Sequence, residues 1–150
     1  MKAGSKARSA ARLAAVQALY QHDMEGTALA LLLDEFHRHR LGAEIEGDQY
    51  AAADVAFFDD VVKGVAARRD EIDELLSGKL AEGWRLERLD KTMLQILRAG
   101  ARELLARHDV PTGYEIREYV DVAHAFFEAR DAKFDNGVLD GVSKVVRCPA

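Results

Sequence analysis

Basic and hydroxyl side chains gather near the start of the chain, and their types suit the binding of phosphate. Arg8 and Arg12 are four residues apart, so a helix through them places both guanidinium groups on one side. Lys6 precedes them by less than two turns, and Ser5 and Ser9 lie beside them. Guanidinium groups bind phosphate through paired N–H donors, and serine hydroxyls add contacts to phosphate or sugar. This spacing predicts an anion-binding face on the first helix.

Tyr20 follows Arg12 by two helical turns, at the border between the basic and the apolar side of the same predicted helix. An exposed tyrosine there can stack on an unpaired nucleobase, a contact worth ~1–3 kcal/mol that does not depend on the identity of the base. The position equally suits a tyrosine at the rim of the core with its hydroxyl in water. The residue pattern leaves both interpretations open.

The charge of the chain is unevenly distributed. The 150 residues include 21 basic and 26 acidic side chains, for a formal net charge of −5. Residues 1–22 contain four basic residues and no acid, so the rest of the chain carries a net charge of −9. This acidic body excludes a general polyanion binder. A local basic cluster can still bind nucleic acid, because phosphate contacts depend on nearby charges.

No set of residues points to catalysis or to a metal site. Cys148 is the only cysteine, which excludes an internal disulfide and a cysteine-cluster metal site. Asp121 and His124 are three residues apart and can share a helix face, but no closed ligand set surrounds them. No glycine-rich phosphate loop is present. None of the histidines lies in a nucleophile motif; they are His22, His37, His39, His108 and His124. We therefore expect a protein that is not an enzyme and needs neither a metal nor another cofactor.

The composition is that of one folded domain. Apolar residues make up 49% of the chain and charged residues 31%, which argues against a disordered protein. No apolar run approaches the ~18 residues of a membrane-spanning helix. The lysines near the N-terminus are not followed by the apolar segment of a signal peptide. Together with the single cysteine, this favours a cytoplasmic protein that makes no contact with a membrane.

Apolar residues recur at helical spacing along most of the chain, and no segment alternates as a strand does. We expect helices at about 6–24, 28–41, 54–76 and 86–107, a helix opened by the capping box Thr112-Gly-Tyr-Glu115, and a last helix capped by Asp131. Residues 42–52 should form a loop. The prediction is an all-α fold of about seven helices in one compact domain, residues 1–150, with a loose arm at residues 1–5 and a tail at residues 147–150.

Three stretches carry more specific motifs: ARSAARLAAVQALYQ (7–21), WRLERLDKTMLQILRAGARELLARHDVP (84–111) and EIREYVDVAHAFFEARDAKFDNGVLDGVSK (115–144). They resemble the bacterial NusB family of transcription antitermination factors. VQALYQ and KFDNGVLD are the most specific pieces. The resemblance runs from near residue 6 to near residue 146, which is nearly the whole chain.

The resemblance implies an all-helical fold made of two small helical subdomains. It also implies a protein that binds the boxA element of ribosomal RNA leader transcripts together with NusE, a protein of the small ribosomal subunit. The pair joins an RNA polymerase complex that resists termination. The resemblance implies no catalysis and does not indicate which surface meets NusE.

The same resemblance assigns RNA-binding residues, which are Lys6, Arg8, Arg12 and Tyr20 near the start and Lys133 and Asn136 near the end. Arg130, at which the chain departs from the family pattern, is expected to supply a further RNA contact. Phe134 is expected to be partly in the core, and Gly137 to allow close helix packing.

The chain departs from the family pattern at three places. Residues 9–11 interrupt an arginine run that family members often have, and Met93 and Arg130 stand where the family often has acids. We therefore predict weak RNA binding by the protein alone and tighter binding with NusE. We also predict that alanine at both Arg8 and Arg12 weakens RNA binding with little change in melting temperature, because both side chains are expected to be exposed.

A second hypothesis is a homodimeric protein-interaction scaffold with weak or no RNA binding. Some members of the family form dimers, and a dimer could cover the basic face of the first helix. Burial of Arg12 and Tyr20 in a self-interface would favour this hypothesis.

Overall fold

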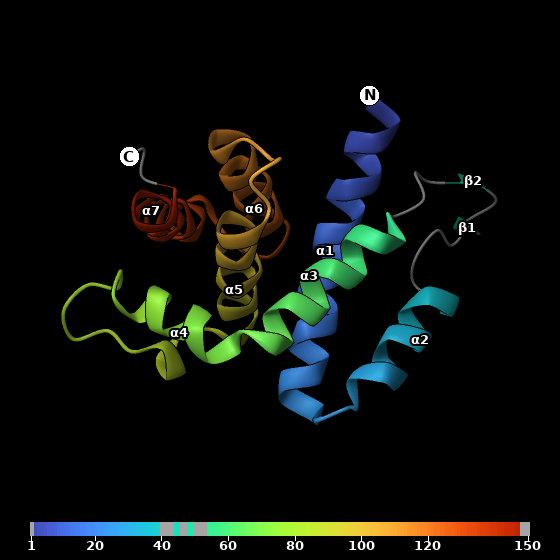
Figure 1. Cartoon of the computed structure of the whole chain (residues 1–150), viewed down its shortest axis with the longest axis horizontal. Coiled ribbons are helices and arrows are strands. Elements are labelled where there is room, and N and C mark those ends of the chain that lie inside the picture. Colours follow the sequence, from blue (N-terminus) through green and yellow to red (C-terminus); the bar gives the residue numbers. More distant parts are fainter. Residues whose placement is uncertain (1, 40–43, 46–47, 50–53, 148–150) are drawn as a thin grey trace. The chain divides into compact units, whose positions relative to one another are not determined.

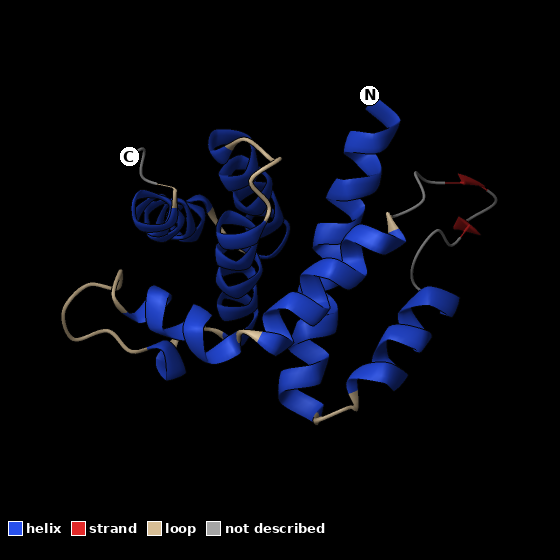
Figure 2. Ribbon diagram, in the orientation of Figure 1, coloured by secondary structure: helices blue, strands red, loops and turns tan. Residues whose placement is uncertain are grey.

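The computed structural model describes residues 2–39, 44–45, 48–49 and 54–147. The chain divides into two compact units, residues 1–64 and 65–150. Helices dominate both units (Figures 1 and 2). The described residues contain seven α-helices, which confirms the prediction of an all-α fold with about seven helices.

The first unit contains α1 (Lys2–Glu25), α2 (Leu29–His39) and most of α3 (Val55–Ala67). Gly26 ends α1 with a φ of +70°, and its N–H donates to the carbonyl of His22. Asp54 caps α3 as predicted, because its Oδ1 accepts a hydrogen bond from the backbone N–H of Phe57 at 2.9 Å.

The second unit contains α4 (Arg69–Ser77), a short 3₁₀ helix at Leu86–Arg88, α5 (Lys91–Ala106), α6 (Thr112–Phe126) and α7 (Ala129–Val146). Helices α5, α6 and α7 pack against one another. Their close approach requires Gly100, since a Cβ there would lie 2.8 Å from a methyl carbon of Leu139. A part-buried ion pair joins α4 to α5: Arg98 donates from Nε and Nη2 to the two carboxylate oxygens of Asp73, both at 2.9 Å.

Several predicted boundaries are wrong for local reasons. Helix α1 begins at Lys2, so residues 2–5 are helical and not a loose arm. The helix expected at 54–76 is interrupted at Arg68, whose backbone leaves the helical region at φ −120° and ψ 24°. The expected loop at 42–52 contains the two-residue strands β1 (Glu44–Ile45) and β2 (Asp48–Gln49), paired antiparallel.

The long helix of the second unit starts five residues later than predicted. Asp90 is its N-cap, and the Asp90 carboxylate accepts hydrogen bonds from the N–H groups of Thr92 and Met93. The predicted capping box does not form either, because Thr112 already lies in α6 and Pro111 occupies the N-cap. Asp131 lies in the first turn of α7 and does not cap it.

Arg147, the first residue of the expected tail, is held against the end of α5 by hydrogen bonds. Its guanidinium donates to the backbone carbonyls of Glu103, Leu104, Arg107 and Val110. It also donates to Thr112 Oγ1 at 3.1 Å. The last carbonyls of a helix have no partner within the helix. The Arg147 side chain therefore closes the C-terminal end of α5; residues 148–150 lie outside the described part.

Within the described residues, no helix combines the length and the apolar character needed to cross a membrane.

Candidate nucleic-acid interface

Arg8 and Arg12 lie on the same side of α1, as their spacing predicts, but that side faces α3. Both guanidinium groups stack on the ring of Phe57, with their carbons 4.7 Å and 4.9 Å from its centre. Cation–π contacts of this kind stabilise a folded chain without any ligand. Both arginines therefore contact Phe57 of the same chain.

Arg12 is fully buried, so the expectation that it is exposed is wrong. A long side chain with an apolar stem packs well against an aromatic ring, which explains its place in the core. Arg8 is half-buried, and its Nε lies 3.7 Å from a carboxylate oxygen of Asp54. About a third of the Arg8 side chain, 35%, is exposed.

Lys6 and Tyr20 are the accessible members of the predicted set on α1. Lys6 is exposed, and Tyr20 exposes 39% of its surface. The two residues lie fourteen positions apart, so about 21 Å of helix separates them at 1.5 Å per residue. This exposure is compatible with both interpretations of Tyr20, a base-stacking residue and a residue at the rim of the core.

An aromatic groove of about 360 Å³ lies in the second unit, beside the start of α7. Its principal lining residues are Trp84, Arg88, Met93, Phe127, Arg130 and Phe134. The rings of Trp84 and Phe134 are 5.9 Å apart and tilted by 32°. Trp84 is 58% exposed, although tryptophan is usually well buried. An exposed indole and two half-buried phenyl rings beside guanidinium groups suit a nucleobase and its phosphate.

Arg130, which the sequence predicts as an RNA contact, is exposed and lines this aromatic groove. Met93 is 4% exposed and lines the same groove. The described lining of the groove therefore carries two arginines, Arg88 and Arg130, and two carboxylates, Asp90 and Asp131.

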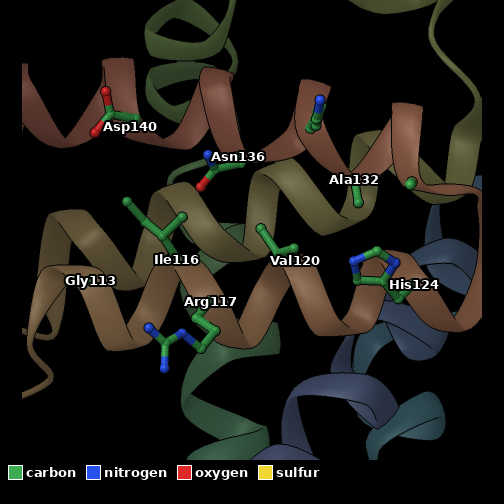
Figure 3. Close-up of a pocket in the computed structure, with 10 residues that line it drawn as sticks. Gly113, Ile116, Arg117, Val120, His124, Ala132, Asn136 and Asp140 are labelled. Atoms are coloured by element: carbon green, nitrogen blue, oxygen red, sulfur yellow. The ribbon is translucent and has the colours of Figure 1, made fainter.

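Lys133 and Asn136 lie in a different groove, between α6 and α7 (Figure 3). Both side chains are exposed. The three RNA-binding residues expected on α7 are therefore divided between two grooves. Arg130 lines the aromatic groove, and Lys133 and Asn136 line the α6–α7 groove. Phe134 is half-buried, as expected for a residue partly in the core. Gly137 is exposed, and a Cβ added there would meet no atom of another element within 4 Å, so close helix packing is not its role.

Asp135 is a strongly perturbed acid of this region. It is fully buried, and neither carboxylate oxygen accepts a hydrogen bond within the described residues. Burial raises the pKa of Asp135 to about 8, because a charged carboxylate is poorly solvated in the core. No group of three His, Cys, Asp or Glu residues that could hold a metal ion occurs in the described part of the chain.

The chain matches the model of the NusB family over residues 9–144. It belongs to the NusB family. It is 77% identical over 142 residues to the transcription antitermination protein NusB of Novosphingobium aromaticivorans, covering 95% of this chain and 96% of that one. It is 62% identical over 147 residues to the NusB of Sphingopyxis alaskensis, covering 98% and 99%. Membership of the family makes the chain a transcription antitermination factor and not an enzyme.

Solved NusB structures have the same fold. A NusB from T. maritima is 30% identical, with a TM-score of 0.73 over 91% of this chain and 90% of that one. NusB in a crystal structure of NusB and NusE with double-stranded RNA is 23% identical, with a TM-score of 0.75 over 92% of this chain and 96% of that one. The second likeness shows the fold alone.

Sequence reasoning missed the aromatic groove of this NusB-family chain. Trp84, Arg88 and Phe127 are not among the predicted site residues. The groove brings together residues 84–93, around the start of α5, and residues 127–134, around the junction of α6 and α7, and these two segments are far apart in the sequence. The sequence signal that could have indicated this groove is the presence of Trp84 and Phe126-Phe127 next to the ends of predicted helices.

Proposed function

We propose that this chain binds the boxA RNA of ribosomal RNA leader transcripts together with NusE, and that it joins the RNA polymerase antitermination complex in the cytoplasm. The family supports antitermination, and the chemistry of the described surface supports RNA as the ligand. The observation that carries the proposal is the aromatic groove with its two arginines.

The aromatic groove suits an unpaired base better than a duplex. Trp84 and Phe134 present ring surfaces in a space of about 360 Å³. Stacking on such rings contributes ~1–3 kcal/mol per base whatever the base is. Arg88 and Arg130 line the same space and supply the phosphate contacts. An RNA strand that enters this groove can therefore be held at both its bases and its backbone.

The first unit contributes a smaller share in this proposal. Lys6 and the exposed ring of Tyr20 are its contact residues, with Arg8 adding charge from a half-buried position. Arg12 supports α1 and α3 from the core. With few phosphate contacts the protein alone binds RNA weakly, and NusE strengthens the complex. A solved complex of another NusB with NusE and double-stranded RNA supports NusE and RNA as the two partners, and it does not bear on which residues of this chain contact the RNA.

Fluorescence anisotropy with a short boxA-like RNA and a scrambled control tests the proposal. We expect a preference for the boxA-like RNA that increases when NusE is added. Trp84→Ala and Arg130→Ala should each weaken binding by about tenfold, the equivalent of one lost stacking or ionic contact. Phe126→Ala is the matched control, because Phe126 is 42% exposed but does not line the groove.

Two results would overturn the proposal. One is equal affinity for both RNAs, with and without NusE. The other is an equal loss in the Phe126→Ala and Trp84→Ala variants, which would mean that any exposed aromatic has the same effect. Measurement at two salt concentrations adds a check, since each phosphate contact contributes roughly 0.7 to the salt slope on single-stranded RNA.

The scaffold alternative is supported by a separate observation. Met24 and Leu31 expose 50% and 68% of their surfaces in the first unit. Exposed apolar side chains are common at protein interfaces, although scattered single ones are ordinary. A dimer that uses them would lose stability on Leu31→Glu. Light scattering at several protein concentrations distinguishes a dimer from a monomer. A concentration-dependent dimer that Leu31→Glu dissociates favours the scaffold hypothesis, and a monomer at every concentration excludes it.

A further inference from the structure

The groove between α6 and α7 has an aliphatic floor that runs along three turns of α6. Ile116 and Val120 stand on α6 on the side toward α7, with Ala132 opposite them (Figure 3). The lining extends from Gly113 to His124, about 16 Å of helix at 1.5 Å per residue. The space measures about 560 Å³. Its length matches about three turns of another helix.

The rim of this α6–α7 groove is cationic. Arg117 and Lys133 are exposed, and neither has a hydrogen bond or an ion pair among the described residues. Asp140 is the lining carboxylate, and it is already paired with Lys144, at 3.2 Å. His124 adds a third basic group at one end. Unpaired cations on a chain of net charge −5 mark a local surface that attracts acidic groups.

The residue types favour a protein segment over RNA here. The described lining contains no Phe, Tyr or Trp ring, whereas single-stranded RNA binds through stacking on aromatic side chains. An aliphatic floor between two helices with charged edges is the complement of an amphipathic helix laid in a groove. The aromatic groove of the same unit differs in its floor, which contains the rings of Trp84, Phe127 and Phe134.

We propose that the α6–α7 groove binds about three turns of an acidic amphipathic helix from a partner protein. The apolar side of that helix covers Ile116, Val120 and Ala132. Its acidic flanks pair with Arg117 and Lys133. This interaction is additional to the binding of RNA in the aromatic groove, and it assigns Lys133, which the sequence predicts as an RNA contact, to a protein partner instead.

A titration with a synthetic helix tests this inference on the full chain. The probe is an amphipathic peptide of about four helical turns, with leucine at every third or fourth position and glutamate on both flanks. The control peptide has lysine at every glutamate position. Amide shifts in the ¹⁵N-labelled protein are expected at α6 and α7 residues of the groove, and the acidic peptide should bind at least about tenfold more tightly than the basic one.

Variants locate the contact. Arg117→Glu should weaken binding of the acidic peptide by at least about tenfold and leave boxA-like RNA binding unchanged. Arg117→Gln should lie between wild type and Arg117→Glu, and it keeps the proposal testable if the charge reversal unfolds α6. Lys63→Glu is the control, because Lys63 is an exposed lysine on α3 with no ion pair in the described part of the chain.

Three results would overturn the inference. Equal binding of the acidic and basic peptides would mean that only apolar contact matters. Amide shifts outside the α6–α7 groove would place the peptide elsewhere. A loss of RNA binding with no loss of peptide binding in Arg117→Glu would assign the groove to RNA.

Discussion

At the scale of single residues, Arg12 shows how one spacing serves two roles. Its four-residue separation from Arg8 predicts an anion-binding pair, and the same separation stacks both guanidinium groups on Phe57. Helical spacing determines which residues share a side, but it does not determine whether that side faces water or the core. The aromatic partner lies on a different helix, so the sequence of α1 alone does not reveal it.

We predict that Arg12→Ala destabilises the first unit by about 2–4 kcal/mol, because it removes a buried stem and a cation–π contact. Lys6→Ala, at an exposed position, should change stability by less than about 0.5 kcal/mol. Urea unfolding followed by circular dichroism measures both. Equal stabilities would mean that Arg12 contributes nothing to the core, and would contradict its assignment. Burial of Arg12 thus reverses the expectation from sequence that alanine at Arg8 and Arg12 leaves the melting temperature unchanged.

Two variants of Tyr20 distinguish a stacking contact with RNA from a hydrogen bond to it. If the ring stacks on a base, Tyr20→Phe should retain most of the RNA affinity, while Tyr20→Ala should lose about tenfold, a stacking contribution of ~1–3 kcal/mol. Anisotropy titrations of the two variants provide the comparison. Similar losses in both would show that the hydroxyl, and not the ring, makes the contact.

Asp135 makes stability depend on pH. The folded chain holds the Asp135 proton up to about pH 8, because burial raises its pKa to about 8, while the unfolded chain releases it near the ordinary value of 3.8. Since the folded state then binds more protons than the unfolded state between about pH 4 and 8, stability falls with rising pH, by up to roughly 1.4 kcal/mol per pH unit from this group. Below about pH 4 both states hold the proton, so Asp135 makes no pH-dependent contribution to stability.

Asp135→Asn should remove that dependence. The amide has nearly the shape of the carboxylic acid but carries no charge at any of these pH values, so the variant should gain stability over wild type as the pH rises from 5 to 8. Urea midpoints at pH 5, 6.5 and 8 measure the difference. Parallel pH profiles for the two proteins would mean that Asp135 does not titrate in this range.

At the scale of elements, helix ends are harder to predict than helices. The apolar periodicity indicates each helical region, since burial of one side requires it. The ends depend on single hydrogen bonds, such as those of Asp90 to the N–H groups of α5. Arg68 interrupts a periodic run in which no glycine or proline marks the break. The aromatic groove cannot be predicted from local sequence either, because it forms between two distant segments, residues 84–93 and 127–134, that only the tertiary fold brings together.

Arg147, which follows α7, donates hydrogen bonds to the last carbonyls of α5, and we predict that these bonds stabilise the fold. Arg147→Ala should lower the free energy of unfolding by about 2–4 kcal/mol, because the C-terminal carbonyls of α5 lose their partners. Arg147→Lys should recover only part of this, since an ammonium lacks the planar fork of a guanidinium. Thermal unfolding followed by circular dichroism provides the test, with Lys144→Ala as an exposed control on the same helix. A loss no larger than the control's would show that Arg147 is dispensable.

At the scale of the whole molecule, the two compact units have different kinds of accessible surface. The first contributes an exposed lysine and an exposed tyrosine, and buries one of the two arginines that the sequence predicts to bind anions. The second contains an aromatic groove with two arginines and a separate aliphatic groove with a cationic rim. The uneven charge of the sequence indicates the first surface. The other two depend on packing between helices, so charge counts along the chain do not reveal them.

The most direct test of RNA binding in the aromatic groove uses Trp84, which is the only tryptophan in the chain. Its fluorescence reports on whatever contacts its exposed ring. Titration with boxA-like RNA should quench this fluorescence with the same midpoint as the anisotropy change, and the scrambled RNA should quench it only at higher concentration. Anisotropy that shows boxA-like RNA bound while the Trp84 emission stays unchanged would contradict the proposal that RNA occupies the aromatic groove.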